Sequence, residues 1–153
     1  MSSIELEVPF ARTYCARLIG RHLTGEAAHL RFIMCMLAGT APDQLTRPKT
    51  LRHVEELAIA ITSGKLADAR PENAFERAIV AGFTATTIPT RLQSLVQDGR
   101  AGEAALRAID LLSGGATGDL DELTDALAFL RLSGFDDTAR RAVFELLFLE
   151  RRG

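Results

Sequence analysis

The sequence lacks an apolar run long enough to cross a lipid bilayer. Its longest apolar stretch is FIMCMLAG at 32–39, whereas a transmembrane helix needs about 20 such residues in succession. The first residues, MSSIELEVPF, carry Glu5 and Glu7 where a secretory signal needs positive charge followed by an apolar run. We therefore expect no membrane span and a cytoplasmic location.

An excess of charge of one sign is also lacking. The chain has 18 basic and 20 acidic residues and a formal net charge of −2. No overall field therefore draws it to nucleic acid or to anionic lipid, and we expect no nucleic-acid partner. Among the basic residues only Lys49 and Lys65 are lysine. Such a preference for arginine is typical of GC-rich bacterial genomes.

Cysteine is scarce, with Cys15 and Cys35 the only two. Both lie in apolar sequence with helical character, and free cysteine is among the most buried residue types, which favours two buried thiols. A single disulfide is the alternative. A chain of 153 residues can bury a sufficient core without a disulfide or a metal.

Helix signals run through the whole sequence, whereas strand signals are nearly absent. Apolar residues recur at helical spacing between N-capping residues, prolines and terminal glycines. We therefore predict an all-α fold of about eight helices in one compact domain, 1–153. The helices would stack as irregular hairpins, either solenoid-like or as an orthogonal bundle, around the strongly apolar helix 24–38. The predicted helices are 8–20, 24–38, 50–64, 70–83, 86–99, 102–115, 118–134 and 135–153.

Alanine recurs near the middle of these helices. A small residue at such a position lets two helix backbones approach closely where they cross, which stacked hairpins require. The alanines concerned are Ala58, Ala78, Ala108, Ala126 and Ala142.

The last third of the chain combines a helix, a GG loop, a second helix, the segment GFDDTARR (134–141) and a final helix. In this pattern it resembles the C-terminal ends of uncharacterised Arg-rich bacterial helical-hairpin proteins. The resemblance implies a helical-hairpin architecture and brings no catalytic residue with it.

Motifs for catalysis or metal binding are missing. The sequence has no G-x-S-x-G, no phosphate-binding G-x-x-x-x-G-K-[ST] and no G-x-G-x-x-G after a strand. Glu26 and His29 form one E-x-x-H, but a di-iron site needs a second. We predict no catalytic residue, no metal site and no cofactor. His22, His29 and Cys35 are the candidate lining of a ligand or cofactor pocket, although ordinary surface or partly buried histidines are favoured.

A small basic cluster precedes the helix predicted at 50–64. Arg47, Lys49, Arg52 and His53 lie at or near its start, where the positive end of the helix dipole adds to their charge. The cluster is a candidate anion-binding site. The alternative is a solvated connector with ordinary surface charge.

The terminal helix carries two apolar stripes. One, through Ala139, Val143 and Leu146, would dock it onto the domain. The second would then be exposed as an interaction patch, unless the helix is inserted between two others and both stripes are core. The patch would consist of Phe144, Leu147 and Phe148, rimmed by Arg140 and Arg151.

These features favour a non-catalytic interaction or scaffold module that self-associates or docks to a protein partner. The alternative is a ligand- or cofactor-binding helical bundle, such as a small sensor, with its pocket near His22, His29 and Cys35. An enzyme without a sequence signature is the third possibility.

Overall fold

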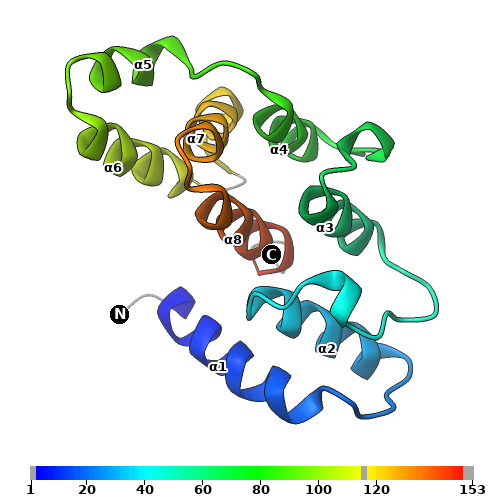
Figure 1. The fold of residues 1–153 in the computed structure, drawn as a ribbon. Helices are drawn as coiled ribbons and strands as arrows, with labels where there is room; N and C mark the ends of the chain where they lie inside the picture. Colours follow the sequence, from blue (N-terminus) through cyan, green and yellow to red (C-terminus); the bar gives the residue numbers. More distant parts are fainter. Residues whose placement is uncertain (1–2, 115–116, 150–153) are drawn as a thin grey trace.

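The computed structural model describes residues 3–114 and 117–149, and side chains from residue 9 onward (Figure 1). This part of the chain forms eight α-helices and no strand, so the prediction of an all-α fold is confirmed. The helices are α1 (Ser3–Leu18), α2 (Glu26–Leu37), α3 (His53–Ser63), α4 (Ala74–Thr84), α5 (Thr90–Gln97), α6 (Ala101–Leu112), α7 (Leu120–Leu132) and α8 (Asp136–Phe148). Two 3₁₀ turns, η1 (Pro42–Gln44) and η2 (Leu66–Asp68), follow α2 and α3.

The last two helices form the middle of the fold. α7 packs against α4 and α6, while α8 packs against α2 and α3 (Figure 1). α1 lies beside α2, and α5 lies beside α6. The prediction that the helix at 24–38 is the centre is therefore wrong. The apolar half of α2 is covered by α1 and α8, whereas Leu30 in its first half is 45% exposed.

Most helices begin later than the sequence pattern predicts. α4 begins at Ala74 rather than near Pro71, because the side chain of Asn73 accepts the backbone N–H of Glu76 at 2.9 Å. α3 begins at His53 after an extended Arg52, rather than at Thr50. α1 instead begins at Ser3, so Pro9 lies inside the helix. Asp119 caps α7 as expected, through the backbone N–H groups of residues 121 and 122.

Helices α4 and α7 cross at close range. A Cβ added to Gly82 would lie 2.7 Å from Cβ of Leu127, so only glycine fits this contact. The hydroxyl of Thr124 on α7 also donates to the carbonyl of Ala78 on α4 at 3.1 Å. Four of the five recurring alanines are buried, at positions 58, 78, 108 and 126. This agrees with the role predicted for them at helix crossings.

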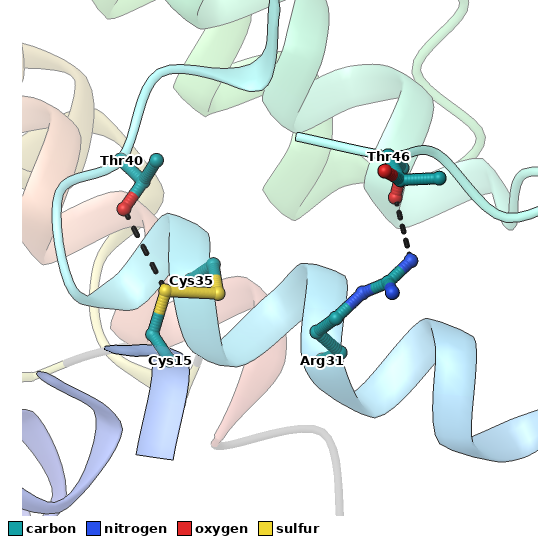
Figure 2. The surroundings of a disulfide bond; sticks show 5 residues. All are labelled: Cys15, Arg31, Cys35, Thr40 and Thr46. Atoms are coloured by element: carbon teal, nitrogen blue, oxygen red, sulfur yellow. Dashed lines mark hydrogen bonds between the residues drawn. A yellow bond between two sulfur atoms is a disulfide. The ribbon is translucent and has the colours of Figure 1, made fainter. Parts of the chain in front are cut away.

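A disulfide joins α1 to α2 (Figure 2). The Cα atoms of Cys15 and Cys35 are 4.9 Å apart, and both residues are buried. The favoured prediction of two free thiols is therefore wrong. The spacing of the cysteines alone leaves the pairing open, because it is the α1–α2 hairpin that brings them into bonding range.

Within the described ranges, no helix is long and apolar enough to cross a bilayer.

Candidate functional site

The aromatic stripe of α8 belongs to the core. Phe144 and Phe148 are each 7% exposed and Leu147 is 1% exposed. The prediction of an exposed apolar patch at these residues is wrong, and the alternative, in which both stripes are core, describes the structure. The reason is the central place of α8, where α2, α3 and α7 cover it from several sides.

Of the two arginines predicted to rim that patch, the structure describes only Arg140. Nη2 of Arg140 lies 2.6 Å from Oδ2 of Asp136, one turn earlier on α8. Arg140 is thus paired within its own helix. Arg151 lies outside the described residues.

An apolar groove remains open between α6 and α8. Its volume is about 380 Å³. On the α6 side, Leu106 is 70% exposed and Ile109 is 51% exposed. The sequence did not single out these residues, because the position of a residue on a helix does not show whether another helix covers it. The groove is lined by Ile109, Leu112, Ser113, Thr138, Ala142, Glu145, Leu146 and Leu149.

Two of the histidines bind buried carboxylates. Nδ1 of His29 lies 2.8 Å from Oε1 of Glu55, and Nε2 of His53 lies 2.8 Å from Oε2 of Glu76. Both glutamates are fully buried. Nδ1 of His53 also lies 3.5 Å from the carboxylate of Glu72. His53 therefore contacts two carboxylates, and its predicted role in binding an anion stays a prediction.

Four of the predicted residues meet in one cavity. His22 and His29, from the predicted cofactor pocket, line it together with Arg47 and Lys49 from the predicted anion cluster. Cys35 does not line it, because its sulfur is in the buried disulfide. Arg52 and His53 also lie outside this lining; the side chain of Arg52 pairs with Glu26.

The cavity lies between the α1–α2 loop, the first turns of α2 and the segment that precedes α3. Its volume is about 560 Å³, within the range of small-molecule sites. Every charged residue of its lining is basic. The lining consists of Gly20, Arg21, His22, Leu23, Thr24, Gly25, Ala28, His29, Arg31, Thr46, Arg47, Pro48, Lys49 and Thr50.

Arg31 and Arg21 are the charged residues of this cavity that sequence reasoning missed, and Arg31 is the buried one. It is only 4% exposed. Its Nη1 donates to the carbonyl of Arg21. Its Nη2 donates to the carbonyl of Thr46 at 3.0 Å (Figure 2). It thereby ties together the two loops that wall the cavity. The available signal was an arginine directly before the apolar run FIMCML, on a helix expected to be buried.

The described residues contain no group of three or more His, Cys, Asp or Glu that could hold a metal ion. Comparison of the chain with protein families, curated proteins and solved structures finds no match. Function therefore has to be argued from the groove and the cavity themselves.

Proposed function

We propose that this chain is a non-catalytic interaction module that self-associates through the groove between α6 and α8. The observation that carries the proposal is a leucine 70% exposed, Leu106, on the helix that forms one wall of an apolar groove. Large apolar side chains gathered around an open groove are typical of protein–protein contact surfaces.

A second copy of the chain is the occupant that fits this arrangement. In a two-fold symmetric contact the same surface is used by both copies. α6 supplies a projecting apolar edge through Leu106 and Ile109, and together with α8 it supplies the adjoining groove. Each copy can therefore place its α6 edge against the groove of the other, and both copies bury apolar surface at once. The terminal helix keeps a role in association, although through Ala142 and Leu149 rather than through its phenylalanines.

The test is the mass in solution of the wild type and of Leu106→Asp/Ile109→Asp, by light scattering after size exclusion. The substituted side chains are largely exposed, so the variant should fold, which circular dichroism checks. Leu30→Asp is the control, because Leu30 is also exposed but lies on α2, which forms no wall of the groove. We expect a dimeric wild type, a dimeric control and a folded monomeric double variant. A wild type that is monomeric at about 100 μM, far above the Kd of a stable dimer, would overturn the proposal.

A further inference from the structure

We propose that the cavity between the α1–α2 loop and the segment preceding α3 binds a small phosphorylated molecule. Arg21, Arg47 and Lys49 would hold its phosphoryl group, together with the start of α2. This site shares no lining residue with the α6–α8 groove. The inference therefore does not depend on self-association.

The positive charge of the cavity favours an anionic ligand. Arg21, Arg47 and Lys49 are exposed and line it from two separate loops, and none of the three has a carboxylate partner among the described residues. No Asp or Glu occurs in the lining. The formal charge of the whole chain is −2, so this concentration of positive charge is local. A concave site lined by one sign of charge attracts ligands of the opposite sign.

Two carboxylates adjoin residues of the lining, and both already have partners: Glu26 follows Gly25 in the chain, and Glu55 pairs with His29. Glu55 accepts the backbone N–H of Arg52 at 2.8 Å and lies beside His29. Glu26, which is 78% exposed, pairs with the side chain of Arg52. Neither carboxylate belongs to the lining, and neither pairs with Arg21, Arg47 or Lys49.

The buried charge of Arg31 also favours an anion in the cavity. A buried guanidinium is costly unless a negative group compensates its charge. Here both terminal nitrogens are held by backbone carbonyls, and no ion pair with a carboxylate occurs in the part of the chain that the structure describes. A bound anion in the cavity would supply the missing negative charge. Arg31 at the same time fixes the two loops, so the basic side chains are held near one another before a ligand arrives.

The start of α2 adds a further group that favours an anion. No side chain caps this helix, and its N-cap residue is Gly25, which lines the cavity. Gly25 has φ +57°, and a Cβ added there would meet no atom within 4 Å. The space beside Gly25 is therefore open. An uncapped helix N-terminus offers N–H donors and positive potential to an anion.

The arrangement of donors favours a phosphoryl group over a carboxylate. The basic side chains come from the loop before α2 and from the segment before α3, and the helix start adds a third direction. A tetrahedral dianion can accept donors from three directions, whereas a planar carboxylate accepts mainly two parallel bonds from one arginine.

The size and lining of the cavity indicate the rest of the ligand. A volume of about 560 Å³ is larger than inorganic phosphate needs and lies in the range of organic ligands. No Phe, Tyr or Trp lines it, so the large aromatic side chains on which a nucleobase stacks in single-strand binding sites are absent from the lining. A sugar phosphate, with hydroxyl groups for Thr24, Thr46 and Thr50, fits the polar residues of this lining.

Isothermal titration of the whole chain tests the inference, with ribose 5-phosphate, inorganic phosphate and succinate as probes. The variant is Arg47→Ala/Lys49→Ala, whose side chains are exposed, so that folding is preserved. The control is Arg12→Ala/Arg17→Ala, which removes the same charge from exposed positions of α1 outside the lining. We expect ribose 5-phosphate to bind the wild type more tightly than either other probe. The cavity variant should bind it at least about tenfold more weakly, whereas the control should bind like the wild type.

Three results would overturn the inference. If ribose 5-phosphate does not bind at millimolar concentration, the cavity is not a site for a small phosphorylated molecule. Equal losses in the cavity variant and in the control would show diffuse attraction to positive charge. Binding of succinate or inorganic phosphate as tight as that of ribose 5-phosphate would contradict the assigned ligand class.

Discussion

His53 on α3 and Glu76 on α4 are joined by a contact of 2.8 Å between Nε2 and Oε2, and Glu76 is fully buried. The same relationship occurs one helix earlier, between His29 on α2 and Glu55 on α3. In each case the glutamate is the third residue of its helix, and its carboxylate also accepts a backbone N–H just before that helix begins. One carboxylate thus stabilises the start of a helix and fixes it to the helix before.

Replacing Glu55 by alanine should destabilise the fold strongly. The change leaves His29 and the backbone N–H of Arg52 without their acceptor in a buried site, at a cost of about 2–4 kcal/mol in the free energy of unfolding. Urea denaturation measures it. Glu56→Ala is the matched control, because Glu56 is the next residue and is exposed. Similar losses for the two variants would contradict the buried pairing.

Gly82→Ala and Gly102→Ala should change stability in opposite directions. Both glycines lie in helices, but a Cβ at Gly82 would contact Leu127 at 2.7 Å, whereas one at Gly102 meets nothing within 4 Å. We expect Gly82→Ala to lose about 1–3 kcal/mol through overpacking at the α4–α7 crossing. Gly102→Ala should gain up to about 1 kcal/mol from helix propensity. Thermal unfolding of both variants checks the sign, and a stabilised Gly82→Ala would show that α4 and α7 do not cross there.

Loss of the disulfide should lower the stability of the protein. Cys15 and Cys35 are 20 residues apart, and closing a loop of that length is worth about 3 kcal/mol in the chain-entropy model. Adding a thiol reductant should therefore lower the urea midpoint of the wild type. The Cys15→Ser/Cys35→Ser variant should start with a lowered midpoint and should not respond to the reductant. An equal response of both proteins would mean that the reductant acts elsewhere.

Truncating Phe144, within α8, should lower stability far more than truncating Phe135, which directly precedes α8. Phe144 is 7% exposed and Phe135 is 48% exposed. We expect Phe144→Ala to cost about 3–5 kcal/mol, as is usual for a buried ring, and Phe135→Ala to cost less than about 1 kcal/mol. Denaturant unfolding compares them directly. A well-folded Phe144→Ala with unchanged stability would restore the exposed patch predicted from the sequence.

Local signals predicted the helices well, because they depend on neighbouring residues. Glycines 64, 99 and 134 follow α3, α5 and α7 with positive φ, as their sequence positions indicate. What failed depends on contacts between distant segments. The sequence places Phe144 in a second apolar stripe of α8, but it does not show whether another helix covers that stripe. Phe144 is buried because α8 lies in the middle of the fold.

The candidate sites show the same limit. The sequence pointed to His22, His29, Arg47 and Lys49, but it assigned them to two separate sites. Their meeting in one cavity depends on Arg31, which spans from α2 to the carbonyls of Arg21 and Thr46. A long-range contact between a side chain and two loops leaves no periodic signal in the sequence. The pairing of Cys15 with Cys35 was left open for the same reason.

The bond between Cys15 and Cys35 makes the chain between them a covalently closed ring, and the ring contains residues 20–25, which line the basic cavity. A protease that cuts after the exposed Arg21 would open this ring without releasing either fragment. The nicked protein would migrate as one molecule on a non-reducing gel and as two after reduction, with the N-terminal helix still tethered beside α2 until the sulfurs separate.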